Sequence, residues 1–376
     1  QFTWFMDKEE IELEKEKDKD MTVDTGVDLV GPNFFSIHPK QDSLRFRAPV
    51  ALFNMKEKTI FCNRVEYLDI ADARIYPDSS RVVVRKKAKI DEFTNATIVA
   101  NYITKYHKFE RATVNVTARR AYTASGEYPY YSKDSIPTYI VMQNIKPDSA
   151  CVTRAEGVVE KERSFQLNDY FDYYGKLKVV ASSPEIFFDG ATRINHECTD
   201  YERNWLAFAS FVDPQNIQIP VKSTMKNLEG EAISAGIVWR DSPVVDSIAM
   251  YPTFLSKLVS ATDPVIASAN GYLTFNKYSN EFQIGTKDKL VNRNAAGNFL
   301  AMNINTCNLL AEGVIDLGMD HGDVKIETVG TANYDRVSNE TRFNLTARFN
   351  MALDKGQMKD VAERINEANL KPMEFN

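Results

Sequence analysis

Short strand-like runs of apolar and aromatic residues, some of them alternating with polar residues, recur from about residue 40 to residue 193. Phe46, for example, lies between Arg45 and Arg47. Alternation of this kind is typical of half-buried strands, and many short strands separated by turn residues predict a sandwich, barrel or solenoid. The clearest runs are 44–48, 82–84, 97–99, 114–116, 139–141, 177–180 and 185–188.

The segment from about 200 to 262 has a different pattern. Trp205, Phe208 and Phe211 recur at intervals of three residues, and apolar residues cluster similarly in 254–259. Spacing of three and four is typical of helices. We therefore predict a short helical insert here, between two β units.

Strand patterns return from about 265 to 349. Residues 271–275 and 281–284 predict a hairpin, and 314–317 and 324–327 predict another. The chain then ends in an amphipathic helix, because five apolar residues fall on one helical face. The pattern as a whole predicts a mainly β fold, with elongated jellyroll, sandwich or solenoid-like units, a short helical insert and a C-terminal helix. The five residues are Met358, Val361, Ala362, Ile365 and Ala368.

These patterns divide the chain into five expected parts. Residues 7–20 are nearly all charged, which indicates a solvated linker or extended segment. The chain opens on Gln1 with aromatic residues close behind, and we interpret it as a fragment of a larger protein. The expected parts are a linker at 1–30, a first β unit at 31–200, a connecting segment at 201–262, a second β unit at 263–350, and a helix with its tail at 351–376.

Net charge argues against one class of partner. The chain carries a formal charge of −6, whereas nucleic-acid-binding proteins usually have a basic footprint. The densest basic stretch is 81–89, with Arg85, Lys86 and Lys87 adjacent. Neighbouring side chains of a strand point to opposite faces, so we expect a solvated edge strand and no single basic face.

Four cysteines leave the compartment open. Cys62, Cys151, Cys198 and Cys307 are far apart, so paired-cysteine metal or redox motifs are absent. They are interpreted as small buried apolar residues, or as one or two disulfides if the chain is exported. No run approaches the ~20 apolar residues of a membrane span.

The sequence names no catalytic, metal-binding or cofactor-binding residue. The four histidines are far apart, and nucleophile elbows and phosphate-binding loops are absent. Two short runs carry metal-ligand types, 196–198 (His-Glu-Cys) and 320–323 (Asp-His-Gly-Asp), without the paired spacing of zinc or calcium sites. We interpret them as a strand end and a hairpin turn. The sequence does not exclude a catalytic pair of carboxylates for glycoside hydrolysis, because distant strands can contribute the two residues.

Two tyrosine-rich segments are the candidate contact sites for a ligand or partner. Tyrosine in a loop offers a rigid ring with a polar hydroxyl, which suits sugar or protein contacts. The alternative is that these rings pack on the β core. The candidates are Tyr128, Tyr130, Tyr131, Tyr170, Tyr173 and Tyr174.

A short repeat provides a resemblance to a known family. Ala-x-Gly followed by two apolar or aromatic residues occurs at 155–159, 269–273 and 311–315, and Tyr-x-x-x-x-Val at 174–179 is a related unit. In these units the chain resembles the lipopolysaccharide-transport bridge proteins of the organic-solvent-tolerance family, over about 40–195 and 265–330. The resemblance implies an open β-jellyroll with an apolar groove for acyl chains; the middle insert and C-terminal helix depart from it.

Three functions follow as hypotheses. The first is a non-catalytic scaffold of a Gram-negative envelope, periplasmic or at the outer membrane, that binds lipid or an envelope protein subunit along its sheet. The second is a surface module that binds glycan or protein through the tyrosine segments. The third is an enzyme acting on envelope polysaccharide. Four Asp-Ser-apolar tripeptides resemble the O-glycan acceptor pattern of exported Bacteroidetes proteins, at 42–44, 134–136, 148–150 and 246–248.

Overall fold

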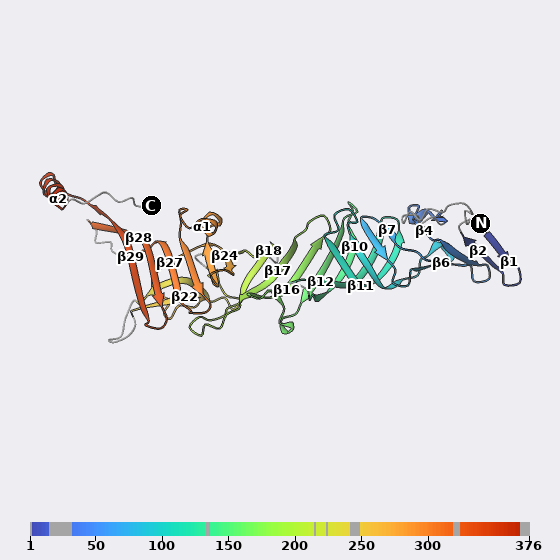
Figure 1. Ribbon diagram of the computed structural model, residues 1–376, viewed down its shortest axis with the longest axis horizontal. Helices are drawn as coiled ribbons and strands as arrows, with labels where there is room; N and C mark the ends of the chain where they lie inside the picture. The colour runs from blue at the N-terminus through green and yellow to red at the C-terminus, as the bar shows by residue number, and fades with distance from the viewer. Residues whose placement is uncertain are drawn as a thin grey trace, which may run out of the picture. The chain divides into compact units, whose positions relative to one another are not determined.

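The computed structural model describes residues 2–14, 32–132, 136–213, 216–222, 225–240, 249–318 and 324–368 (Figure 1). The chain is mainly β and carries a C-terminal helix, α2 (Lys355–Glu367), so this part of the prediction is confirmed. It divides into two compact units. Unit 1 comprises Gln1–Phe165, Tyr174–Gly190 and Ala209–Pro214, and unit 2 comprises Gln166–Tyr173, Ala191–Phe208 and Gln215–Asn376. This division differs from the expected boundary at 201–262.

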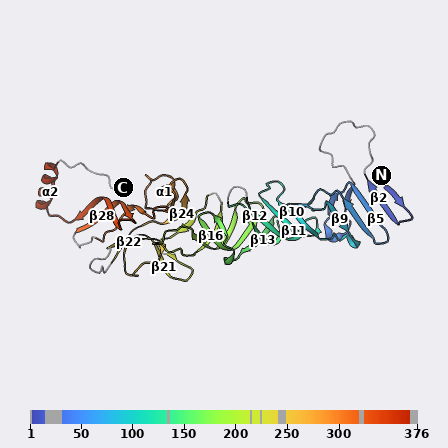
Figure 2. The same cartoon turned by 60° about the horizontal axis from the view of Figure 1, so that its bottom comes forward.

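Unit 1 contains a five-stranded antiparallel sheet that includes the start of the chain. Residues 1–30 were expected to be a linker, yet β1 and β2 pair with each other and β2 pairs with β5. Ile11 and Leu13 alternate with glutamates in β2, so the charged run also carries a strand pattern. The order is β1 (Phe2–Phe5), β2 (Glu10–Glu14), β5 (Val50–Asn54), β6 (Thr59–Asn63) and β9 (Arg81–Val84); β2, β5 and β9 are labelled in Figure 2.

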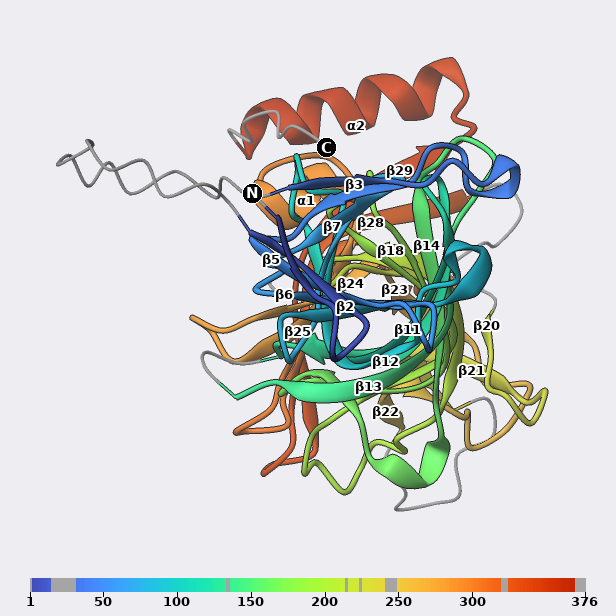
Figure 3. The ribbon, with the colours of Figure 1, turned by 90° about the vertical axis from the view of Figure 1, so that its right-hand side faces the viewer.

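A separate hairpin of two short strands, β3 (Asn33–Phe35) and β4 (Arg45–Arg47), lies beside β7 (Leu68–Ile70) in unit 1 (Figure 3). The 3₁₀ turn η1 (Pro39–Gln41) lies between its strands. A second 3₁₀ turn, η2 (Lys86–Ala88), follows β9. These elements surround the candidate site.

An antiparallel meander of eleven strands supplies most of the remaining structure of unit 1. Burial alternates along these strands, as in β14, where every second residue is buried. Strands β16, β17 and β18 contribute residues to both units. After β7 come β8 (Ala73–Tyr76), β10 (Phe93–Ala100), β11 (His107–Ala118), β12 (Ala121–Tyr130), β13 (Thr138–Pro147), β14 (Thr153–Val159), β16 (Phe171–Val180), β17 (Ile186–Ile194) and β18 (Leu206–Val212), with β15 (Gln166–Asn168) paired to β16.

Unit 2 contains a seven-stranded and a four-stranded sheet. Helices were expected around Trp205–Phe211 and 254–259, but residues 206–211 belong to β18 and residues 254–256 to β22, so the prediction of a helical insert is wrong. A short helix, α1 (Lys287–Val291), occurs elsewhere. The larger sheet has the order β19 (Ile219–Val221), β24 (Gly271–Asn276), β25 (Glu281–Gly285), β26 (Phe299–Asn303), β27 (Leu309–Val314), β28 (Val324–Asp335) and β29 (Glu340–Met351); the smaller contains β20 (Met225–Lys226), β21 (Ala232–Trp239), β22 (Met250–Ser256) and β23 (Val265–Ser268).

The Ala-x-Gly repeat marks positions where adjacent backbone leaves no space for a side chain. A Cβ on Gly271 would overlap the Gly285 carbonyl, and one on Gly313 would overlap Asn298. Both glycines also have φ between 120° and 126°, a conformation that other residues rarely adopt. At Gly157 a Cβ would likewise be too close to the neighbouring strand. The alanines of the repeat are buried in each case: Ala155, Ala269 and Ala311.

Candidate functional site

The β3–β4 hairpin presents two chemically different faces. Phe34 and Phe46 are directly opposite each other, and their rings stack at 5.4 Å between centroids. Arg45 and Arg47 flank Phe46 in sequence and therefore point to the other face, because side chains alternate along a strand. Two cavities lie against the hairpin, an apolar pocket and an arginine-lined cleft, and Phe35 and Phe46 line both of them.

The apolar pocket has a volume of about 310 Å³, at the lower end of the ~300–1,000 Å³ of typical small-molecule sites. Residues of β5, β6 and β9 of the five-stranded sheet and residues of the β3–β4 hairpin line it. Phe35 and Ile37 lie at its opening and are 61% and 98% exposed. Large apolar side chains that are exposed to solvent next to a pocket are typical of a binding site. The other apolar residues lining the pocket are Phe34, Leu44, Phe46, Phe53, Ile60, Val84, Ala88 and Ile90.

Basic residues form the rim of this apolar pocket. Lys58, Lys86 and Lys87 line it and are exposed, and within the described ranges they form no ion pair. Arg85 also lines it, and its guanidinium pairs with Asp91 at 2.7 Å. The pocket therefore combines an apolar interior with three lysines free to bind an anion.

The basic rim corrects the expectation that Arg85, Lys86 and Lys87 cannot share a face. Strand alternation ends at Val84, where β9 ends, and Lys87 has a φ of 62° within η2. The chain therefore turns, and all three side chains reach the same pocket. The side chain of Gln41 donates a hydrogen bond to the carbonyl of Ala88 at 2.7 Å and ties this turn to η1.

The first tyrosine segment lies mostly in strand β12 and largely in the core. Tyr130 is 1% exposed, with its ring against Phe188. The Tyr128 hydroxyl and the Nδ1 of His107 are 3.1 Å apart in a hydrogen bond, and burial raises the pKa of Tyr128 to about 12. Of the three candidates here, Tyr131 alone is exposed, at 55%.

The second tyrosine segment is packed as well. Tyr170 stacks on Phe275 with 3.5 Å between ring centroids, and Tyr173 is 1% exposed. Tyr174 is half-buried, with the Lys161 ammonium 5.5 Å from its ring centre. Tyr170 and Tyr173 are therefore packed and not offered to solvent, because Tyr173 lies on the buried face of β16 and Tyr170, in the turn before this strand, stacks on Phe275. Packing on the β core was the correct alternative for Tyr130 and Tyr173.

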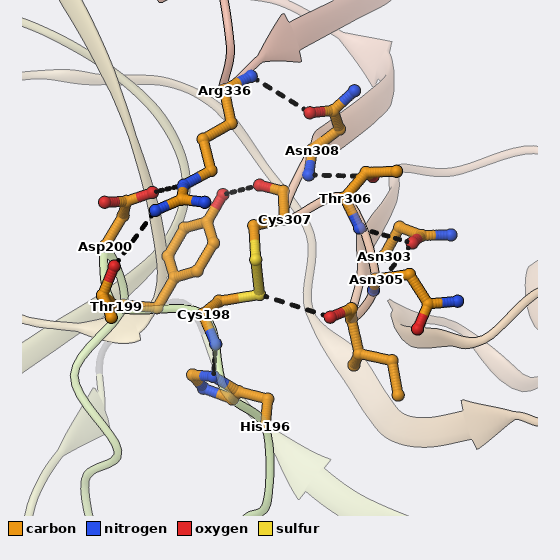
Figure 4. The surroundings of a disulfide bond; sticks show 12 residues. His196, Cys198, Thr199, Asp200, Asn303, Asn305, Thr306, Cys307, Asn308 and Arg336 are labelled. Carbon is orange, nitrogen blue, oxygen red and sulfur yellow. Dashed lines mark hydrogen bonds and ion pairs between the residues drawn. A yellow bond between two sulfur atoms is a disulfide. The ribbon is translucent and has the colours of Figure 1, made fainter.

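Unit 2 contains a disulfide between Cys198 and Cys307 (Figure 4). It joins the loop after β17 to the β26–β27 turn, and the hydroxyl of Tyr201 donates to the Cys307 carbonyl at 3.0 Å. Cys62 and Cys151 are free, and burial raises the pKa of the Cys62 thiol to about 12. The spacing in sequence could not identify this pair.

His196 lies next to the disulfide, in the loop that follows β17, so the strand-end interpretation of 196–198 is correct. Its Nδ1 accepts a hydrogen bond from the backbone N–H of Cys198 at 3.2 Å, while its buried Nε2 has no partner. Burial, aided by the positive charge of Arg203, lowers the pKa of His196 from 6.5 to about 4. The ring is therefore neutral at pH 7. The Asp320–Asp323 segment lies outside the described residues.

No family model, no curated protein and no solved structure matches the chain. Across the described ranges, no group of three or more His, Cys, Asp and Glu side chains is placed to hold a metal ion. In the part of the chain that the structure describes, no helix has the length and hydrophobicity to cross a membrane.

Proposed function

We propose that the protein is a non-catalytic binding protein of the bacterial envelope, and that its apolar pocket holds the acyl chain of a lipid with an anionic head group. The observation that carries the proposal is the combination of an apolar interior with Lys58, Lys86 and Lys87 at the rim. An uncharged apolar ligand would not need these lysines, and a small anion would not need the phenylalanines.

The energetic argument assigns each part of the ligand to one part of the pocket. Burial of an acyl chain releases about 0.8 kcal/mol per methylene group, so the apolar interior supplies most of the affinity. Exposed lysines attract a carboxylate or phosphate at the opening and make binding depend on salt. We therefore expect affinity to grow with chain length and to weaken as ionic strength rises.

The compartment proposed here is extracytoplasmic. Disulfides persist in oxidising compartments such as the periplasm and are rare in the cytosol. The bond between Cys198 and Cys307 supports an exported protein. The Asp-Ser-apolar tripeptides, such as 42–44 and 148–150, are consistent with the same assignment.

The pocket is tested by titrating the protein with a fluorescent C12 fatty acid in Phe35→Ser/Ile37→Ser. Both side chains are mostly exposed, so the double substitution should leave the fold intact. It removes apolar contact at the opening, and we expect a Kd at least tenfold higher, equivalent to about 1.4 kcal/mol. Ile103→Ser is the matched control, since Ile103 is 76% exposed and outside the pocket. Equal loss in both proteins would refute the assignment.

The rim is tested by charge reversal in Lys86→Glu/Lys87→Glu. Binding of the same fatty acid should weaken about tenfold at low salt, and the difference should shrink at high salt as the charges are screened. Lys146→Glu/Lys178→Glu makes the same change of charge at exposed positions outside the pocket. A salt-independent Kd in the wild-type protein would contradict the role of the lysines.

A further inference from the structure

The cleft on the other face of the β3–β4 hairpin has a volume of about 810 Å³ and lies wholly in unit 1. Five arginines line it, from three separate segments: Arg45 and Arg47 of β4, Arg64 after β6, and Arg119 and Arg120 between β11 and β12. A cavity of this size accommodates a ligand of several sugar units, toward the upper end of the ~300–1,000 Å³ of small-molecule sites.

Backbone hydrogen bonds fix the walls of this cleft. The N–H of Arg119 donates to the carbonyl of Gln41 at 3.0 Å, which joins the β11–β12 turn to η1. The N–H of Ala71 donates to the carbonyl of Arg119 at 2.9 Å, which joins the same turn to β7 and β8. The N–H of Tyr102 donates a hydrogen bond to the carbonyl of Asp72 at 2.8 Å. The arginines therefore project from a pre-organised frame.

The charge balance of the cleft is positive although the whole chain carries −6. Two of the three acidic residues lining it are already paired, Asp42 with Arg120 at 2.6 Å and Asp69 with Arg74 at 2.7 Å. Glu66 is the third acidic residue. In the described part of the chain, four lining arginines form no ion pair: Arg45, Arg47, Arg64 and Arg119.

Two tyrosines are among the residues that line the cleft. Tyr67 and Tyr102 line it, and the guanidinium of Arg74 lies 3.8 Å from the Tyr67 ring centre and 5.4 Å from that of Tyr102. A tyrosine ring gives an apolar surface with a hydroxyl at its edge, which suits a sugar ring. Guanidinium groups bind carboxylate and phosphate through two parallel hydrogen bonds.

We infer that this arginine-lined cleft binds an acidic saccharide that carries at least two phosphate or carboxylate groups. Two or more anionic groups are needed because the unpaired arginines come from different walls of the cleft. This cleft shares Phe35 and Phe46 with the apolar pocket of the proposed function, but none of its five arginines lines that pocket and its ligand needs no acyl chain. The two assignments can therefore fail independently.

The first experiment is calorimetric titration of the wild-type protein with inositol hexakisphosphate, with tetragalacturonate and with neutral maltotetraose. We expect binding of at least one anionic probe and none of maltotetraose. Preference for the first probe indicates a phosphorylated saccharide, and preference for the second indicates a uronate. Failure of both anionic probes, or equal binding of maltotetraose, would overturn the inference.

The second experiment replaces two arginines of different walls in Arg45→Gln/Arg119→Gln. Affinity for the anionic probe should fall at least tenfold, whereas Arg45→Lys/Arg119→Lys should lose less because it keeps the charge. Lys146→Gln/Lys178→Gln removes the same charge outside the cleft and should bind as the wild type does. Unchanged affinity in the glutamine variant would overturn the inference. The fatty-acid titration should be unaffected, which separates this site from the apolar pocket.

The free thiol of Cys151 provides a readout in the unmodified protein. Cys151 lines the cleft and is partly exposed, whereas Cys62 is fully buried. Alkylation by N-ethylmaleimide, followed by mass spectrometry, should label Cys151 and should slow several-fold when the anionic probe is bound. An unchanged alkylation rate at saturating probe would contradict occupancy of the cleft.

Discussion

Unit 1 and unit 2 are both antiparallel β structures, but they use their cysteines and cavities differently. Unit 2 is cross-linked by the disulfide between Cys198 and Cys307, 109 residues apart, and a cavity within it measures about 180 Å³. In unit 1 both cysteines are free, and two larger cavities flank one hairpin. Under the proposed function, unit 1 binds the ligand, and the disulfide stabilises unit 2.

The largest effect on stability is expected from removal of the disulfide, which tests the comparison between the two units. Cys198→Ser/Cys307→Ser should destabilise unit 2 by about 4 kcal/mol, because the bond closes a long loop and restricts the unfolded chain. Hydrogen exchange should accelerate in β26 and β27 of unit 2, whereas fatty-acid binding by unit 1 should persist. Cys151→Ser is the control and should change neither. Loss of fatty-acid binding in the double variant would contradict the division of roles.

The next effect concerns the glycine repeat of unit 2. Gly313→Ala should lower the free energy of unfolding by about 3 kcal/mol, because it adds both a strained φ and a collision with Asn298. Gly285→Ala is the matched control, since its new Cβ would meet atoms no nearer than 3.5 Å. Urea denaturation measures both. Equal stability of the two variants would contradict the steric explanation of the repeat.

The smallest of these effects is a pH dependence that arises in unit 2. The pKa of His196 is about 4 in the folded chain and 6.5 ordinarily, so the unfolded chain binds the proton more readily between these values. Stability from this group is complete above pH 6.5 and is lost as pH falls toward 4, by about 2 kcal/mol at pH 4.5. Denaturation of wild type and His196→Asn at pH 7 and 4.5 should show a smaller loss in the variant. His38→Gln, which removes a half-exposed imidazole, is the control.

Unit 1 contains a second buried histidine, which limits how far that pH effect distinguishes the two units. Burial lowers the pKa of His107, whose Nε2 lies 2.6 Å from the carbonyl of Ser183. The sign is the same, so stability from His107 is also lost as pH falls below 6.5. The His196→Asn variant should therefore retain part of the acid sensitivity, located in unit 1 by hydrogen exchange.

Strands with strict alternation were predictable from the sequence, and segments with competing signals were not. In β2, charge hides the alternation of Ile11 and Leu13, so the strand resembled a linker. In the segment of β18, two apolar patterns overlap. Trp205, Phe208 and Phe211 have the spacing of a helix, whereas Leu206, Phe208 and Val212 have the spacing of one strand face and are the residues that are buried. Tertiary pairing decided both cases.

The candidate site depended on contacts that sequence spacing does not encode. The basic run at 85–87 was visible, but its convergence on one pocket depends on the left-handed φ of Lys87 and on the hydrogen bond from Gln41. The tyrosine segments were also visible in the sequence, but the residue type alone does not tell whether a tyrosine is buried or exposed. The sequence signal that leads to the pocket is the Arg-Phe-Arg alternation of β4, which separates an apolar from a cationic face.

The most direct test of the proposed function is photochemical labelling of the protein with a diazirine-bearing fatty acid, followed by peptide mapping. We expect labelled residues to fall in the segments 34–46, 53–60 and 84–90, which contain the residues that line the apolar pocket, and labelling to be displaced by unmodified fatty acid. Labelling concentrated in unit 2, or labelling that unmodified fatty acid does not displace, would contradict an acyl-binding role for unit 1.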